Sequence, residues 1–150
     1  MGKLSEILQL SAKRAADLKL PYAGAVTPKE AGELLQGLPE TRLVDVRTQA
    51  EWDYVGRIPG AIQIEWQTYP GNQRNPNFLA QLKHQVDHES LVLFICRSGG
   101  RSGAAAATAA AAGFTNCHNV LEGFEGDRDA FGRRNTVGGW RAAGLPWEQS

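Results

Sequence analysis

Cysteine, net charge and long apolar runs are all scarce in this 150-residue chain. Its two cysteines, Cys96 and Cys117, are too few for a disulfide framework, so we expect a reducing compartment. Sixteen basic residues balance sixteen acidic ones, which argues against nucleic-acid binding because that binding needs a concentrated positive surface. No apolar run approaches the roughly 18 residues of a membrane span, and the first residues lack the apolar core of a secretory signal. The sequence therefore predicts a cytoplasmic protein with neither a membrane nor a nucleic acid as partner.

What the chain does contain is an alternation of strand-like and helix-like patterns. Short apolar runs predict strands at 25–26, 42–47, 61–65, 91–95 and 119–121. Helices are expected from Thr27, from Thr48, over 75–86 and over 102–112, followed by one or two helical turns over 139–146. Thr27 and Thr48 each precede a glutamate by three residues, the pattern of a capping box. This order predicts an α/β fold with a parallel sheet covered by helices.

The N-terminal residues stand apart from that alternation. Apolar side chains at Leu4, Ile7 and Leu8, separated by charges, predict an amphipathic helix over 3–20. We expect it to pack on the domain, with docking to a protein partner as the alternative. The predicted organisation is an extension over residues 1–24 and a domain over residues 25–150.

The most informative stretch is the buried strand 91–95 followed by a loop over 96–102 and an alanine-rich helix. Glycines in the loop let backbone N–H groups turn inward, and the positive end of the helix adds to them, which makes a cup for an anion. Cys96 stands at the entrance of this cup, with Arg97 and Arg101 beside it. Such surroundings favour a nucleophilic thiolate acting on an anionic substrate. The alternative is a structural cysteine in an arginine-containing turn.

The loop Cys96-Arg97-Ser98-Gly99-Gly100-Arg101-Ser102 resembles the active-site loop of the rhodanese-like sulfurtransferases. Two further stretches resemble that family's signatures: residues 43–61, with Val44-Asp45-Val46-Arg47 and Gly56-Arg57-Ile58-Pro59-Gly60-Ala61, and residues 139–146. The resemblance implies a five-stranded parallel sheet flanked by helices on both faces, with the cysteine loop after the central strand. It leaves residues 1 to about 24 uncovered. It departs from the family at Arg57, where histidine is frequent, and in an insertion over 127–138.

The resemblance also implies a reaction, the transfer of sulfane sulfur through a Cys96 persulfide. The donor would be a small anion such as thiosulfate, and the acceptor cyanide or a thiol. Backbone N–H groups of the loop would stabilise the charge of the persulfide. The implied substrate-binding residues are Arg97, Ser98, Gly99, Gly100, Arg101 and Ser102. Of the two arginines we favour Arg97 for contact with the donor, because Arg101 begins the helix and can brace the loop.

No cofactor and no metal are expected. The three histidines, His84, His88 and His118, have no ligand spacing among them and are expected at the surface. Cys117 is expected to be buried and inert, with a resolving role for Cys96 as the alternative.

Five residues are predicted to support the site: Asp45, Arg47, Glu51, Arg57 and Trp66. Asp45 stands at a strand end, where it either helps to hold the loop region or satisfies local backbone N–H groups. Arg47 and Glu51 are four residues apart at a helix start, which favours an ion pair over a catalytic dyad. Trp66 lies just past a strand, where it either lines the pocket or joins the core.

Two other functions fit some of these residues. A cysteine phosphatase or arsenate reductase has five residues between its cysteine and arginine, whereas four separate Cys96 from Arg101. The smaller ring favours sulfur over phosphate. The other alternative is a persulfide carrier or regulatory interaction module with little turnover of its own.

Overall fold

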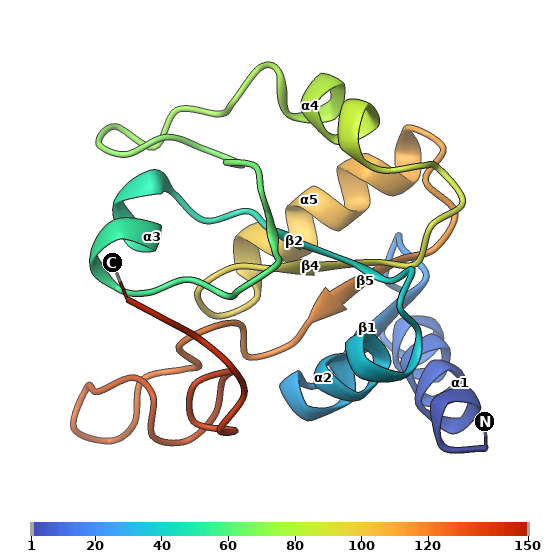
Figure 1. Ribbon diagram of the computed structural model, residues 1–150, viewed down its shortest axis with the longest axis horizontal. Helices are drawn as coiled ribbons and strands as arrows, with labels where there is room; N and C mark the ends of the chain where they lie inside the picture. The colour runs from blue at the N-terminus through green and yellow to red at the C-terminus, as the bar shows by residue number, and fades with distance from the viewer. Residues whose placement is uncertain (1, 150) are drawn as a thin grey trace.

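A parallel sheet of five short strands lies between two layers of helices in the computed structural model, which describes residues 2–149 (Figure 1). The strands are β1 (Gly24–Val26), β2 (Arg42–Asp45), β3 (Ile62–Gln63), β4 (Val92–Ile95) and β5 (Cys117–Val120). The helices are α1 (Gly2–Asp17), α2 (Pro28–Gly37), α3 (Gln49–Tyr54), α4 (Phe78–Gln85) and α5 (Gly100–Ala111).

The strand order is β1-β5-β4-β2-β3, and every pair is parallel. This confirms the predicted five-stranded α/β fold, with β4 at the centre. Asp45 at the end of β2 pairs with Ile95 at the end of β4. The segments that follow these two strands therefore leave the sheet at the same edge, where ligands of parallel α/β sheets usually bind.

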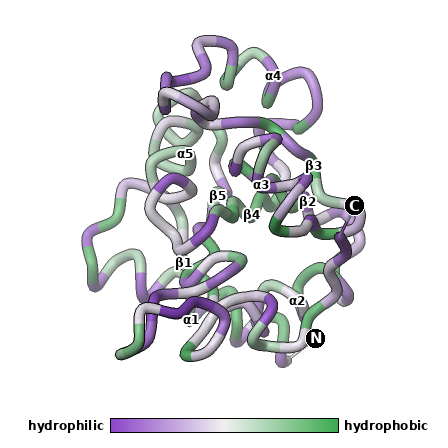
Figure 2. The backbone as a smooth tube through the Cα atoms, turned by 90° about the vertical axis from the view of Figure 1, so that its left-hand side faces the viewer, coloured by the Kyte–Doolittle hydropathy of each residue, from purple (hydrophilic) through white to green (hydrophobic). Residues whose placement is uncertain are grey.

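Each face of the sheet has its own apolar core. One core lies under α4 and α5, where Phe94 of β4 contacts the layer that includes Phe78, Leu82 and Ala105. The other lies under α1 and α2, where Leu93 and Ile95 point to the opposite side. Figure 2 shows the hydrophobic colour gathered at β2 and β4 between the two helical layers. This two-sided burial explains why the central strand is apolar at every position.

Two capping boxes begin helices α2 and α3, as predicted. Thr27 accepts a hydrogen bond from the N–H of Glu30, whose carboxylate accepts from the N–H of Thr27. Thr48 and Glu51 make the same reciprocal pair at α3. Each cap is worth about 1 kcal/mol. The second box fixes Glu51 close to the edge of the sheet where β2 and β4 end.

Helix α1 covers the β1 side of the sheet and buries a histidine that we expected at the surface. His118 of β5 is only 3% exposed, so the prediction was wrong for this residue. Its Nδ1 lies 2.6 Å from the buried Ser11 Oγ of α1, and its Nε2 lies 2.8 Å from Asn116 Oδ1. Three histidines on short polar segments look alike in a sequence, and only the return of α1 over β5 distinguishes this one. The docking role and the separate 1–24 extension stay predictions.

The C-terminal region contains the single helical turn that was predicted as one or two. Within residues 139–146, a hydrogen bond of 3.0 Å from Ala143 N to Gly139 O closes one helical turn, which does not continue into an α-helix. The 127–138 insertion contains neither helix nor strand. Within residues 2–149, no helix is both long and apolar enough to cross a bilayer.

Candidate active site

The loop between β4 and α5 forms a cup around the sulfur of Cys96. Gly99 has a φ of 112°, a left-handed conformation that glycine adopts without strain, and it ends the loop as the N-cap of α5. Its N–H donates to Cys96 Sγ at 3.1 Å, and Ser102 Oγ lies 3.3 Å from the same sulfur. Cys96 is 1% exposed, so it is buried within the loop and does not stand at the entrance where we expected it.

The turn over residues 122–126 holds the other side of the cysteine loop. Phe124 N donates to Cys96 O at 2.8 Å, and Glu125 N donates to Arg97 O at 3.0 Å. Gly123 lies so close that a Cβ built on it would be 2.5 Å from Cys96 O. The backbone of the loop is therefore fixed from a segment about 27 residues further along the chain.

Arg101 braces the loop through a two-pronged ion pair with Glu51. Its Nη1 and Nη2 lie 2.7 and 2.9 Å from the two carboxylate oxygens, and both side chains are about one-fifth exposed. Burial alone would raise the pKa of Glu51, but the hydrogen bonds and charge of Arg101 outweigh it and hold this pKa below its usual range. The predicted pair between Arg47 and Glu51 was therefore wrong. Arg47 precedes the helix, so the four-residue spacing rule does not apply to it.

Arg47 instead forms a fully buried ion pair with Asp45. Both side chains are completely buried, and Arg47 Nη2 lies 2.7 Å from Asp45 Oδ2. The same guanidinium donates to Gly56 O and stacks on Phe124, 4.1 Å from the ring centroid. Asp45 also accepts from the N–H of Arg47, which confirms the expected satisfaction of a local backbone N–H; its support of the site stays a prediction.

A pocket of about 570 Å³ opens beside the loop. Arg97 and Arg101 line it, and Tyr54 and Tyr69 form part of its exposed rim. Trp66 does not line this pocket. It is 4% exposed, its ring centroid lies 5.1 Å from that of Phe78 in an edge-to-face arrangement, and Arg74 Cζ lies over its ring at 3.9 Å from the centroid.

Of the remaining predicted residues, some belong to the cysteine loop and others lie outside it. Ser98 and Gly100 belong to the cup itself, between β4 and the first turn of α5. Arg57 pairs through its backbone with Glu148, which ties the 56–58 segment to the C-terminal segment. Cys117 is fully buried, and burial raises the pKa of its thiol to about 12.

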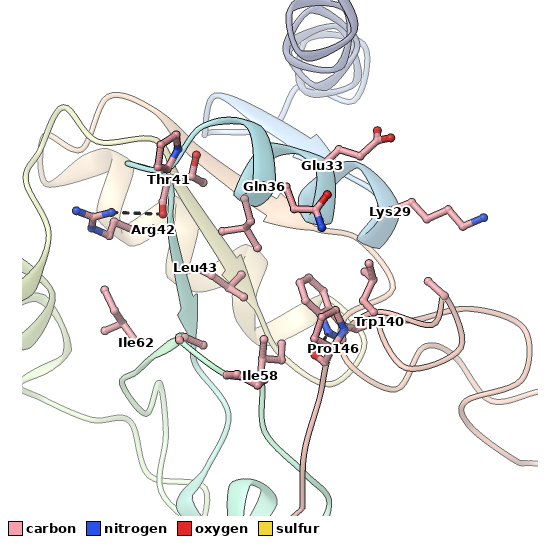
Figure 3. Close-up of a pocket in the computed structure, with 18 residues that line it drawn as sticks. Lys29, Glu33, Gln36, Thr41, Arg42, Leu43, Ile58, Ile62, Trp140 and Pro146 are labelled. Carbon is pink, nitrogen blue, oxygen red and sulfur yellow. Dashed lines mark hydrogen bonds between the residues drawn. The ribbon is translucent and has the colours of Figure 1, made fainter.

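A second hollow of about 770 Å³ lies between α2, the start of β2 and the C-terminal segment (Figure 3). Leu43, Ile58, Ile62, Trp140 and Pro146 supply much of its wall. No residue of the 96–102 loop borders it, so it is separate from the cysteine cup.

One residue of the cup was not foreseen. Asn119 of β5 places its Oδ1 2.5 Å from Ser102 Oγ and donates from Nδ2 to Gly99 O at 3.2 Å. The signal available in the sequence was a polar pair, His118-Asn119, inside a strand that a parallel sheet buries.

The fold and the cup together define an α/β protein with a candidate nucleophilic cysteine at the carboxyl edge of a parallel sheet. A family model described as "Rhodanese-like domain" matches residues 27–130. The chain belongs to this rhodanese-like family, as the sequence motifs predicted.

Similar proteins agree with the family match. A Rickettsia prowazekii protein called "Uncharacterized protein RP600" is 39% identical over 110 residues, or 71% of this chain and 81% of that protein. "Thiosulfate sulfurtransferase 16, chloroplastic" of Arabidopsis thaliana is 32% identical, over 73% of this chain and 89% of that one. The crystal structure of Rv0390 from M. tuberculosis is 46% identical, with a TM-score of 0.79 over 86% of this chain and 99% of that chain.

Proposed function

We propose that this protein is a sulfurtransferase that takes sulfane sulfur from thiosulfate or a similar small anion and passes it to cyanide or a thiol. The observation that carries the proposal is the position of Cys96 Sγ, which accepts the Gly99 N–H at the N-terminus of α5. An N–H donor and the helix terminus both favour negative charge on this sulfur. The names of relatives such as the A. thaliana thiosulfate sulfurtransferase support the same reaction.

The proposed reaction has two displacement steps. The Cys96 thiolate attacks the outer sulfur of thiosulfate, a new S–S bond forms, and the old S–S bond breaks to release sulfite with its electron pair. The acceptor, for example cyanide, then attacks the outer sulfur of the persulfide. Thiocyanate leaves and the Cys96 thiolate is restored. Neither step requires a metal, a redox cofactor or a general base once the thiol has ionised.

The two arginines of the loop have different proposed roles. Arg97 is exposed and lines the pocket, whereas Arg101 is committed to Glu51. We expect Arg97→Ala to raise the KM for thiosulfate roughly tenfold, since it removes a charged hydrogen-bond donor. Its stability should change by less than about 0.5 kcal/mol.

We expect Arg101→Lys to lower the stability of the protein and to leave the KM for thiosulfate largely unchanged. A lysine cannot reproduce the two-pronged contact with Glu51, and the free energy of unfolding should fall by about 1–2 kcal/mol. Urea unfolding and thiosulfate saturation curves of both variants test this division. It is wrong if Arg101→Lys raises KM without affecting stability, or if Arg97→Ala lowers stability as much as Arg101→Lys.

A thiosulfate:cyanide assay tests the proposed activity. Cys96→Ser should lose thiocyanate formation by roughly three orders of magnitude or more, because the nucleophile is gone. Cys117→Ala is the matched control, since it removes the other, fully buried cysteine, and its turnover should remain. Turnover by Cys96→Ser would refute the proposal. Persulfide formation without turnover would favour the carrier role, and faster hydrolysis of a phosphate ester would favour a phosphatase.

A further inference from the structure

The hydroxyl of Ser102 has three hydrogen-bond acceptors around it but only one proton to donate. Its Oγ lies 2.5 Å from Asn119 Oδ1, 3.2 Å from Gly99 O and 3.3 Å from Cys96 Sγ. A serine carries one hydroxyl proton, so one acceptor receives it at a time. Ser102 is fully buried, and no solvent replaces a donor that turns away.

The orientation of the Asn119 amide is fixed by the loop. Its Nδ2 faces Gly99 O at 3.2 Å, and the reversed amide would place two acceptor oxygens against each other. Oδ1 must therefore face Ser102. At 2.5 Å this is the shortest of the three contacts, so the Ser102 proton belongs to Asn119 when the sulfur is uncharged.

Ionisation of Cys96 reverses that preference. The uncharged thiol can donate its own proton to Ser102 Oγ, which continues the chain of hydrogen bonds to Asn119. A thiolate has no proton to give and attracts the hydroxyl of Ser102. If that hydroxyl turns to the sulfur, Asn119 Oδ1 loses its donor in a buried place, which has a free-energy cost.

We propose that Asn119 is a positioning residue that opposes the ionised form of Cys96 by competing with its sulfur for the hydroxyl proton of Ser102. This inference rests on the proposed function, in which Cys96 is the sulfur that ionises and then carries the persulfide. When sulfur is loaded, the negative charge moves to the outer sulfur of the persulfide, and the Ser102 proton can return to Asn119. Asn119 thus disfavours the free thiolate relative to the persulfide and promotes sulfur loading.

Other charged and titratable groups surround the loop on every packed element. They are Arg97 of the loop itself, Arg101 of α5, Glu51 of α3, Asp45 at the end of β2 with Arg47 after it, Glu125 of the 122–126 turn, and Tyr22 before β1, whose side chain is hydrogen-bonded to that of Asn119. A test must hold them constant. A double-mutant cycle on residues 119 and 102 does so, since all four members keep these groups.

The test measures the rate of Cys96 alkylation by iodoacetamide against pH, with Cys117→Ala in every member so that one thiol reacts. In the protein that keeps Ser102, Asn119→Ala should lower the pH at the midpoint of the alkylation profile by roughly one unit. In the Ser102→Ala background the same Asn119→Ala change should leave the midpoint unmoved, because no hydroxyl proton remains to be shared. Asn119→Val, which keeps more of the volume and suits a strand, is the second variant and should behave alike.

Two results would overturn the proposal. One is a midpoint that stays or rises when Asn119 is replaced in the Ser102 background. The other is an equal shift in both backgrounds, which would mean that Asn119 acts only by holding Gly99 O. Because alkylation does not need thiosulfate, a failure here is distinguishable from a failure of the proposed activity, which the thiocyanate assay reports.

Discussion

Gly123→Ala is expected to lower the free energy of unfolding by about 2–5 kcal/mol. The loss has two causes, because alanine must adopt a left-handed backbone conformation and its Cβ clashes with neighbouring atoms. The φ of Gly123 is 63°, and a Cβ there would lie 2.5 Å from both Cys96 O and Arg97 C. These are backbone atoms of the cysteine loop, which cannot rotate away as a side chain can. The clash must therefore move the loop that forms the cup, so sulfur loading of Cys96 should fall even in the folded fraction.

Gly60→Ala is the matched control for this prediction. Gly60 also has a positive φ, 81°, but nothing lies within 4 Å of the position that a Cβ would occupy there. We expect only the conformational cost, about 1–2 kcal/mol, and unchanged sulfur loading. Urea unfolding with a thiosulfate loading assay measures both effects. Equal losses in the two variants would show that the contact between Gly123 and the cysteine loop is not significant.

The stability of the protein is expected to fall as the pH drops from about 6.5 to about 4, because of His118. Burial lowers the pKa of this histidine from 6.5 to about 4 in the folded protein. Between these values the unfolded chain binds a proton that the folded protein excludes, so acid favours unfolding. The pKa difference between the folded and unfolded states corresponds to a loss of about 3 kcal/mol in the free energy of unfolding across this range. Above about pH 6.5 the histidine is neutral in both states, and its contribution no longer changes.

Variants at two histidines separate this effect from general acid denaturation. His118→Gln removes the titrating group and should flatten the dependence of unfolding free energy on pH between 6.5 and 4.5. His84→Gln, at an exposed position of α4, should retain the wild-type slope. Burial would raise the pKa values of Glu30 and Glu51, but the hydrogen bonds and charges of their arginine partners hold both below 4.5, so these carboxylates change the stability only near and below pH 4.5. A wild-type slope in His118→Gln would contradict the assignment.

Local sequence patterns predicted the parts of this fold that depend on local interactions. Thr27 and Thr48 could be assigned as caps because a capping box spans only four residues. The apolar run ending at Ile95, followed by glycines and alanines, placed Cys96 between a buried strand and a helix terminus. The edge of the sheet that carries the candidate site followed from these elements and the rules for parallel sheets.

The errors concern contacts between residues far apart in the chain. Glu51 pairs with Arg101, 50 residues away, and the nearby Arg47 turns to Asp45 instead. His118 is buried by a helix that begins more than 100 residues earlier. Asn119 reaches Ser102 and Gly99 only because β5 lies beside β4 and α5 in the folded protein. The spacing of residues along the chain does not reveal such long-range contacts, so they could be identified only from the three-dimensional structure.

The central claim is that Cys96 holds a transferable sulfur, and intact-mass measurement after thiosulfate treatment tests it most directly. The account predicts that the wild-type protein and Cys117→Ala each gain the mass of one sulfur atom, that cyanide removes it, and that Cys96→Ser gains nothing. An unchanged wild-type mass, or the same gain in Cys96→Ser, would contradict the account.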